Sequence, residues 1–250
     1  MNSNTIDSNI DKFCYGTRAN ECVTVFNPAE QSFQFEYNLK DVLSIDLNQL
    51  NHSCFAKPFS MIEEEDPLIS ETDRELMRVL LIAIYSTFFE FRSSFRSLKD
   101  YLYCSFRMHT GKGEMVRIEK ETHTLANKDG TLLLVDMWRR VDFKAPHKRI
   151  EWGPSVLPEE KEVIVNTIKT HIYRNLGITP LSKREEQIIK LISTGLSLQT
   201  VGEQLFIERN TVKKHLENIK RKLSGKFDKS VISSKDQMSN VVRELGILDI

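Results

Sequence analysis

The sequence contains little cysteine and no long hydrophobic run. Its four cysteines, Cys14, Cys22, Cys54 and Cys104, lie far apart in 250 residues, and none forms a Cys-x-x-Cys pair. A secreted domain held by disulfides needs a much higher cysteine density, so reduced thiols in a cytoplasm are expected. The longest apolar stretch, residues 79–84, is far too short to span a bilayer, and no contact with a membrane is predicted.

The sequence also lacks a secretion signal and an excess of charge of one sign. Its first ten residues are polar, with no basic start followed by an apolar run, so no signal peptide is predicted. Lys+Arg and Asp+Glu both number 35, which excludes a uniformly basic protein that coats nucleic acid. Residues 179–250 nevertheless hold 13 basic and 9 acidic residues, and the rest of the chain carries the opposite net charge. This asymmetry indicates two parts with different roles.

Motifs of catalysis and cofactor binding are missing as well. No Gly-x-Ser-x-Gly, Walker A or Gly-x-Gly-x-x-Gly pattern occurs. His52 and Cys54 have metal-ligand spacing, but no second pair completes a site, so no metal is predicted. His109 and His123 lack an evident nucleophile or orienting carboxylate. We therefore expect that the chain is not an enzyme.

The front of the chain predicts an α+β fold. Residues 1–20 are polar and expected to be poorly ordered. The alternation of apolar residues after them favours strands, and a run that is apolar on nearly every side favours one long buried helix. The expected elements are strands at 23–26 and 33–37, short helical turns within 39–66, a helix at 75–91, and strands at 101–109, 115–125 and 131–141. The last three strands form an antiparallel meander with one face covered by helix.

A connecting helix is expected within residues 151–178. Pro158 and the two following glutamates suit a helix start, and Gly177 suits its end. The helix carries a narrow apolar stripe, which consists of Ile164, Ile168 and Ile172. This stripe packs either on its own domain or against a second copy of the chain, and the spacing alone leaves both alternatives open.

Residues 179–223 carry the most informative pattern. Ser182 and Glu185 form a capping box, Gly195 ends that helix, and Ser197 can cap a second, short helix. Gly202 lies where two closely crossing helices need a small residue. The third helix has an inward face made of Val212, Leu216, Ile219 and Leu223. Two short helices joined by a tight turn, with the second one basic, are typical of a helix-turn-helix.

The third helix and its continuation concentrate positive charge. Residues 209–229 contain eight basic and two acidic residues in a chain with no net charge. A duplex phosphate backbone favours such a patch through counterion release. The alternative is a solvated lysine-rich helix face. The inward spacing, the capping box and the turn together favour nucleic-acid binding.

This segment resembles the LuxR-type (GerE-type) helix-turn-helix of bacterial transcription regulators. The matching residues are Leu181, Ser182, Arg184, Glu185, Leu191, Gly195, Ser197, Leu205, Ile207, Thr211, Val212, Lys213, His215, Asn218, Ile219, Lys222 and Leu223. In that family the helix containing Thr-Val-Lys enters the major groove. The resemblance therefore implies double-stranded DNA as a partner and a homodimer that binds it.

The resemblance also assigns roles to individual residues. It implies that Lys213, Lys214 and Glu217 face the bases, where lysine suits guanine and glutamate can accept from cytosine. For Glu217, an outward solvated residue is an equal alternative. The residues expected at phosphates are Thr211, Asn210 and Arg209 at the helix start, with Lys220 further along.

Two departures from the family pattern bear on these roles. Residues 198–200 read Leu-Gln-Thr where the family has a polar run, which weakens one expected phosphate contact. Residues 224–235 lengthen the loop before the last helix. That helix either pairs two protomers or caps the three-helix core, and the core role is preferred.

The front of the chain resembles a PAS domain. The resemblance rests on the order of elements, on residues 59–66 before the long helix, and on the hairpin at 101–119. It implies a small ligand or partner held between sheet and helices. The expected lining residues are Phe33, Phe35, Leu80, Ile84, Phe88, Leu102, Cys104, Phe106 and Leu134. These residues serve equally well as a solid core. No flavin-type Asn-Cys-Arg motif occurs and residues 71–91 hold no histidine for haem, so no cofactor is predicted.

The sequence therefore predicts a two-domain regulator: a PAS-like sensor at 21–150, a connecting helix at 151–178 and a LuxR-type domain at 179–250. An alternative function is a module whose C-terminal helices bind a protein such as RNA polymerase, with DNA contact secondary. The salt dependence of DNA binding separates the two, because only phosphate contacts release counterions.

Overall fold

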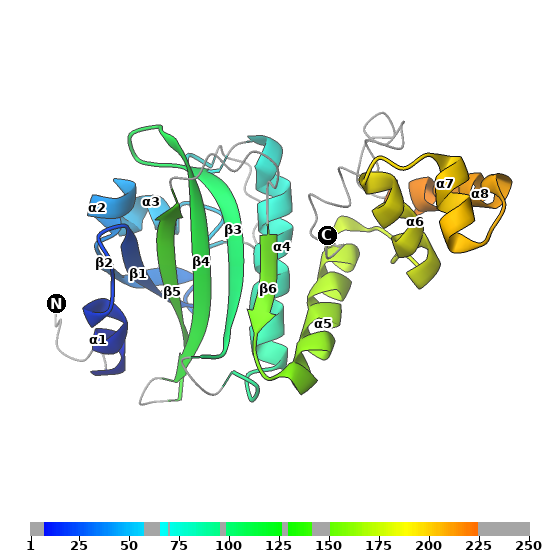
Figure 1. Cartoon of the computed structure of the whole chain (residues 1–250). Coiled ribbons are helices and arrows are strands. Elements are labelled where there is room, and N and C mark those ends of the chain that lie inside the picture. The colour runs from blue at the N-terminus through cyan, green and yellow to red at the C-terminus, as the bar shows by residue number, and fades with distance from the viewer. Residues whose placement is uncertain are drawn as a thin grey trace. The chain divides into compact units, whose positions relative to one another are not determined.

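The computed structural model describes residues 8–57, 66–69, 71–95, 99–126, 130–141 and 151–224. The chain divides into two compact units, residues 1–168 (the front unit) and 169–250 (the C-terminal unit). Helices and strands are labelled in Figure 1. They are α1 (Ser8–Tyr15), β1 (Glu21–Asn27), β2 (Ser32–Tyr37), α2 (Leu39–Leu43), α3 (Leu47–Asn51), α4 (Glu71–Glu90), β3 (Tyr101–His109), β4 (Met115–Ala126), β5 (Leu132–Val141), β6 (Glu151–Ser155), α5 (Pro158–Leu176), α6 (Lys183–Ser193), α7 (Leu198–Leu205) and α8 (Arg209–Leu223).

The described strands of the front unit form one antiparallel sheet in the order β2-β1-β5-β4-β3-β6. The predicted order of elements is confirmed: two strands, short helices, one long helix and three further strands. The α+β fold class is confirmed with it.

Strand β6 was not predicted. Residues 151–155, which the prediction included in the connecting segment, pair with β3, whereas the helix begins at Pro158 as predicted. The strand is hard to predict from the sequence because Gly153 and Pro154 are poor strand formers. An edge strand tolerates both.

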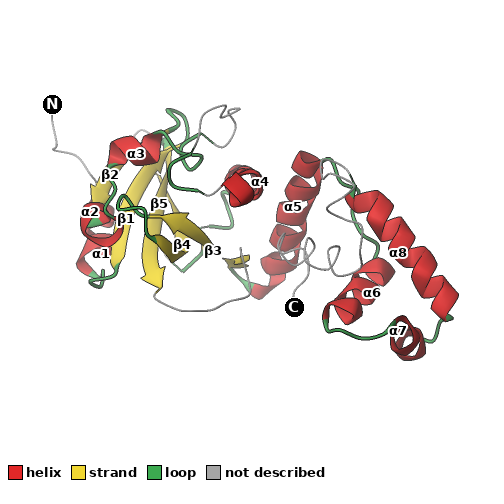
Figure 2. Cartoon of the chain, turned by 90° about the horizontal axis from the view of Figure 1, so that it is seen from above, coloured by secondary structure: helices red, strands yellow, loops and turns green. Residues whose placement is uncertain are grey.

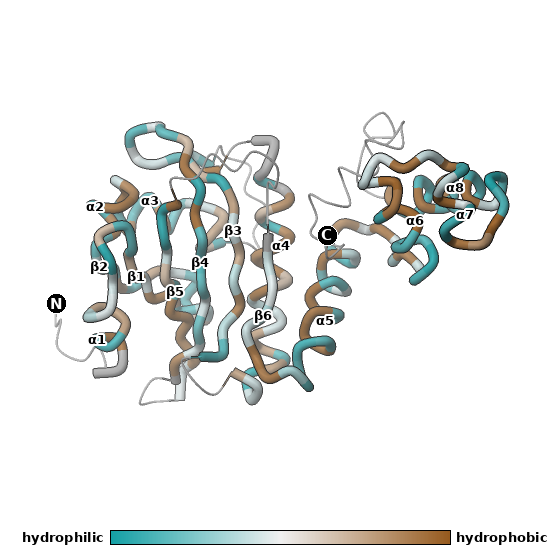
Figure 3. The backbone as a smooth tube through the Cα atoms, in the orientation of Figure 1, coloured by the Kyte–Doolittle hydropathy of each residue, from teal (hydrophilic) through white to brown (hydrophobic). Residues whose placement is uncertain are grey.

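Helix α4 covers one face of the sheet, called here the inner face. The rings of Tyr85 on α4 and Phe26 on β1 stack with centroids 5.3 Å apart. Phe55 meets Trp138 of β5 edge to face at 5.1 Å. Figure 2 shows α4 nearly end-on beside the sheet, and Figure 3 shows hydrophobic residues recurring along α4. The high apolar content that favoured a buried helix is explained by this position.

The N-terminal segment differs from the prediction. Residues 8–15, expected to be poorly ordered, form helix α1. Ile10 and Phe13 are buried against a cluster on the outer face of the sheet that includes Val23, Val25 and Val135. The three-residue spacing of Ile10 and Phe13 places both on one side of a helix, which the polar residues around them obscured.

A β-bulge separates the two phenylalanines of β2. Val25 pairs with Phe35, whereas Phe26 pairs with Phe33, so Gln34 is an extra residue in the ladder. A shift of one residue exchanges the faces of the sheet. Phe33 therefore lies on the inner face beside Phe26, with ring centroids 4.9 Å apart, and Phe35 packs on the outer face.

The stripe of Ile164, Ile168 and Ile172 on α5 is buried in a single chain, with exposed fractions of 0–1%. This burial favours the alternative in which the stripe packs within its own chain.

Candidate nucleic-acid interface

Helix α6 begins with the predicted capping box. The Ser182 hydroxyl accepts from the Glu185 backbone N–H, and the Glu185 carboxylate accepts from the Ser182 N–H at 2.7 Å. Glu185 also pairs with Lys222 of α8 at 2.6 Å. Although burial acts to raise it, the hydrogen bonds from Lys222 and Ser182 hold the pKa of Glu185 below its usual range. One carboxylate thus caps α6 and ties it to α8.

The turn between α7 and α8 brings two backbone segments into close contact at Gly202. A Cβ atom there would lie 2.6 Å from the Ile207 carbonyl oxygen. The Ile207 N–H donates to the Gly202 carbonyl at 2.9 Å. Phe206 ends α7 with a left-handed φ of 54° and an exposed side chain. The predicted need for a small residue is confirmed at Gly202.

Helix α8 separates its apolar and charged residues. Val212, Leu216, Ile219 and Leu223 are buried as predicted. Of the residues predicted to contact DNA, the exposed ones are Arg209, Asn210, Lys213, Lys214 and Glu217, and the partly buried ones are Thr211 and Lys220. The structure brings all seven together on one helix of 15 residues. Because its apolar side is buried, the helix is fixed with its charged side free.

The residues around α8 bear on two further expectations. Ser197 caps α7 by accepting from the Thr200 N–H at 3.1 Å, so the departure at 198–200 leaves the cap intact. Lys226, Lys229 and the expected last helix lie outside the described residues.

A two-helix motif joined by a tight turn, with a basic second helix, is the fold of a helix-turn-helix domain. Residues 179–232 match the family described as bacterial regulatory proteins, luxR family. Residues 179–232 are therefore a LuxR-type helix-turn-helix domain.

A curated relative supports this assignment for the C-terminal part of the chain. The nitrate/nitrite response regulator protein homolog of Haemophilus influenzae is 35% identical over 77 residues, which are 31% of this chain and 36% of the relative. The match thus spans about a third of each protein. Both the family and this relative are described as regulators.

Two solved structures align over most of the chain at low similarity. VqmA of Vibrio cholerae, solved with ligand and DNA, is 11% identical with a TM-score of 0.29, and the alignment covers 95% of this chain and 87% of VqmA. SdiA of Escherichia coli is 16% identical with a TM-score of 0.25, covering 91% and 83%.

The front unit buries most of the residues predicted to line a ligand site. Those with exposed fractions of 3% or less are Phe33, Leu80, Ile84, Phe88, Leu102, Cys104, Phe106 and Leu134. Phe35 does not belong to this set, because the bulge in β2 places it on the outer face near α1. Burial raises the pKa of the Cys104 thiol to about 12, so this thiol stays neutral.

A polar group that was not predicted lies in the middle of the inner face. Lys120 of β4 and Asp136 of β5 form an ion pair at 2.7 Å, and both side chains have an exposed fraction of 0%. The signal was present in the sequence, since the alternation that turns Val116 and Ile118 inward does the same to Lys120. We call Lys120, Thr122 and Asp136 the buried polar centre.

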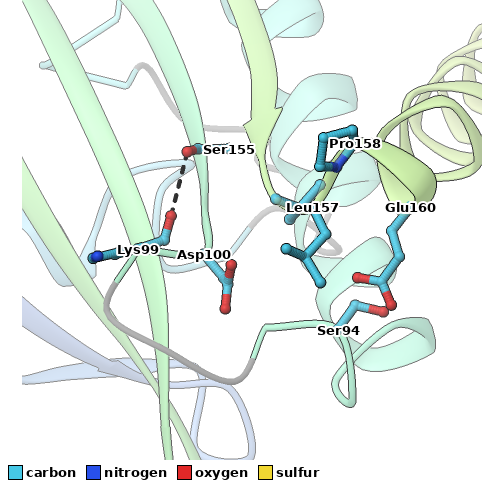
Figure 4. Close-up of a pocket in the computed structure, with 8 residues that line it drawn as sticks. Ser94, Lys99, Asp100, Ser155, Leu157, Pro158 and Glu160 are labelled. Atoms are coloured by element: carbon cyan, nitrogen blue, oxygen red, sulfur yellow. Dashed lines mark hydrogen bonds between the residues drawn. The ribbon is translucent and has the colours of Figure 1, made fainter.

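One open pocket of about 430 Å³ lies where β6 meets α5 (Figure 4). Its residues are Ser94, Lys99, Asp100, Ser155, Val156, Leu157, Pro158 and Glu160. The Ser155 hydroxyl donates to the Lys99 carbonyl at 3.3 Å on its rim. Within the described ranges, no three His, Cys, Asp or Glu residues gather as metal ligands. None of the described helices is long and apolar enough to cross a membrane.

Proposed function

We propose that this protein is a transcription regulator in which α8 reads the DNA major groove and the PAS-like front unit senses a small ligand or a partner. The assigned LuxR-type domain supports the DNA-binding half of the proposal. The order of elements in the front unit supports the sensing half.

The observation that most strongly supports the proposal is that α8 has one buried apolar side and one exposed charged side. Lys213, Lys214 and Glu217 are exposed, and the next turns bury Leu216 and Ile219. In this arrangement the two lysines donate to guanine and Glu217 accepts from cytosine.

Positions at the start of α8 and beyond its middle hold the phosphates. Arg209, Asn210 and Thr211 occupy the first turn, where the helix dipole and free N–H groups also favour an anion. Lys220 reaches the backbone further along the duplex.

A DNA titration tests this proposal. A preferred site is first selected from random duplexes and then titrated with the full chain at several salt concentrations. Lys213→Ala and Lys214→Ala should each lower specific affinity, with discrimination falling by about 1–3 kcal/mol if the lysine contacts guanine. Lys161→Ala, an exposed lysine on α5, is the matched control and should change nothing. Unchanged specific affinity in both variants would refute the groove assignment.

The same titration separates the alternative function. Phosphate contacts give a slope of log affinity against log salt of about −0.9 per neutralised phosphate. Arg209→Ala should reduce that slope by about one unit. A flat dependence would favour binding to RNA polymerase or another protein.

We further propose that two copies act together. A dimer of helix-turn-helix domains binds half-sites spaced by about one helical turn or a multiple of it, so the selected site should show two-fold symmetry. Sedimentation of the DNA complex should give two chains per site, and one chain on an asymmetric site would contradict this part.

A further inference from the structure

Two neighbouring residues at the start of α6 reach opposite ends of the helix-turn-helix. Glu185 pairs with Lys222 in the last turn of α8, which fixes the far end of that helix. Arg184 extends to the other end, where a terminal N–H of its guanidinium donates to the carbonyl oxygen of Leu205, the last residue of α7. This second bond lies four residues before Arg209, the first residue of α8.

The Leu205 carbonyl needs a donor from outside α7. The last carbonyls of a helix have no donor within it, and they form the negative end of the helix dipole. Backbone N–H groups that follow α7 satisfy the Gly202 and Glu203 carbonyls. Arg184 supplies the donor for Leu205, and its positive charge suits the negative end of the helix.

The Arg184 guanidinium is itself held in place. Its other terminal nitrogen donates to Gln187 Oε1 at 3.1 Å, about one turn along α6. The Arg184 side chain is partly buried, whereas the preceding residue, Lys183, is exposed. A planar guanidinium with two directed hydrogen bonds has little freedom, and it therefore defines a position for the end of α7.

The bond acts directly beside the strained residue of the turn. The Leu205 carbonyl belongs to the peptide unit that precedes Phe206, whose left-handed φ is 54°. A residue stays in this region only where its surroundings fix the backbone around it. Arg184 therefore supports the conformation of the turn as well as the end of α7.

The conformation of this turn decides where α8 begins. The residues proposed to contact DNA come early in α8, and they include Arg209, Asn210, Thr211, Lys213 and Lys214. Hydrogen bonds to base edges depend on distance and angle, whereas attraction to the phosphate backbone depends mainly on charge. A small displacement of the start of α8 should therefore lower sequence discrimination more than it lowers non-specific binding.

We propose that Arg184 is a positioning residue, which fixes the start of α8 through the Leu205 carbonyl and thereby sets sequence discrimination in the major groove. Arg184 contacts no base in this role. The inference deepens the DNA-binding function proposed above and rests on it. Its structural half, the fixing of the start of α8, is measurable without DNA.

Two variants separate the hydrogen bond from the charge. Arg184→Met keeps an unbranched apolar stem without a donor, whereas Arg184→Lys keeps the charge and a donor for the Leu205 carbonyl. Arg184→Met should lower affinity for the selected site about 10-fold, near the low end of what one good base contact contributes, and change affinity for a random duplex by less than about 2-fold. Arg184→Lys should restore most of the loss. Lys183→Met removes the same charge one residue earlier and is the matched control.

The salt dependence distinguishes positioning from direct contact. The slope of log affinity against log salt should be the same in Arg184→Met and Lys183→Met. A loss of about one unit in Arg184→Met alone would mean that Arg184 binds a phosphate, which would overturn the proposal. Unchanged specific affinity in Arg184→Met, or a loss that Arg184→Lys does not restore, would overturn it as well.

Hydrogen exchange of the full chain without DNA keeps this inference apart from the proposed function. In Arg184→Met, exchange should quicken at the amides of residues 206–212 and stay unchanged in the last turn of α8, which the Glu185 pair holds. Exchange that rises uniformly from α6 to α8, or not at all, overturns the positioning role whatever the DNA result. If Arg184→Met is unfolded, Arg184→Gln, whose side chain is neutral and shorter, takes its place in both measurements.

The two proposals then fail separately. Local quickening at residues 206–212 in a chain that prefers no DNA site contradicts the regulator and supports the positioning of α8 by Arg184. A preferred DNA site with unchanged exchange in Arg184→Met supports the regulator and contradicts the positioning role.

Discussion

A lysine–carboxylate pair is described in each of the two units, and the two pairs differ in what surrounds them. Lys222 and Glu185 meet at the rim of the helix-turn-helix, where the lysine side chain is 23% exposed. Lys120 and Asp136 meet inside the sheet, where both are fully buried. A rim lysine can turn to water when its partner is removed, whereas a buried one cannot. The same bond therefore has a modest structural role in one unit and a large energetic consequence in the other.

The largest expected effect comes from breaking the buried pair on one side only. Asp136→Leu leaves the Lys120 ammonium without its counter-charge, which should cost about 3–5 kcal/mol of unfolding free energy. Adding Lys120→Met should recover most of this loss. Hydrogen exchange of the full chain is the measurement, with faster exchange in β4 and β5 and unchanged exchange in α6 to α8. A single variant as stable as the double variant would show that the pair is not isolated from water.

A close backbone contact, rather than charge, gives the next effect in the C-terminal unit. Gly202→Ala places a Cβ atom 2.6 Å from the Ile207 carbonyl oxygen, and a backbone atom cannot move aside easily. Overpacking of this kind should cost about 1–3 kcal/mol and displace the turn before α8. Gly16→Ala is the control, because its nearest atom lies at an ordinary 3.9 Å. Chemical denaturation of both variants measures the difference, and equal stability would place the crossing further apart than described.

Removing the carboxylate charge should lower the unfolding free energy much less at the Lys222–Glu185 pair than at the Lys120–Asp136 pair. Glu185→Gln keeps an acceptor for the Ser182 N–H and removes the charge opposite Lys222, which should cost about 0.5–1 kcal/mol. Glu186→Gln, one residue along α6, is the control. A loss as large as that of Asp136→Leu would remove the distinction between the pairs.

The Lys222–Glu185 pair should also make the unfolding free energy depend on pH in acid. Since the folded pKa of Glu185 is lowered, its contribution to stability is present above the usual value of about 4.3 and is lost as the pH falls through the folded value. The unfolding free energy of the unaltered chain should therefore fall more steeply below about pH 4.3 than that of Glu185→Gln.

The sequence predicted the C-terminal unit in more detail than the front unit. Local rules sufficed for the C-terminal unit, because a capping box, a small residue at a crossing and a four-residue apolar repeat all act between near neighbours. Ser182, Gly202 and Leu216 were predicted in the positions where the structure has them. The DNA contacts assigned to α8 remain predictions.

The front unit depends on contacts between distant segments, and its errors have that origin. The bulge that moves Phe35 to the outer face is set by pairing with β1, which alternation within one strand does not reveal. The partner that buries Lys120 lies on another strand, 16 residues later. Helix α1 packs on a face of the sheet that includes Val23, Val25 and Val135, and all three follow it in the sequence.

The smallest expected effect is a gain, and it lies at the turn of the helix-turn-helix. Phe206 has a left-handed backbone with φ of 54° and a side chain that is 95% exposed. A side chain with a Cβ is strained there and gains little from packing, whereas asparagine tolerates this conformation. Phe206→Asn should therefore raise the unfolding free energy by about 0.5–1 kcal/mol. Phe206→Leu, which keeps the strain, should leave stability unchanged in the same denaturation series.

The DNA affinity of Phe206→Asn decides why a strained, exposed aromatic residue stands at this turn. Strain at an exposed position persists most readily where the side chain has a role in binding. If Phe206 packs against the sugar-phosphate backbone beside α8, the more stable variant should bind its selected site less tightly, and Phe206→Leu should lose part of that affinity too. Equal affinity in all three proteins would instead confine recognition to α8, and would leave the turn as a connection that fixes the helix angle.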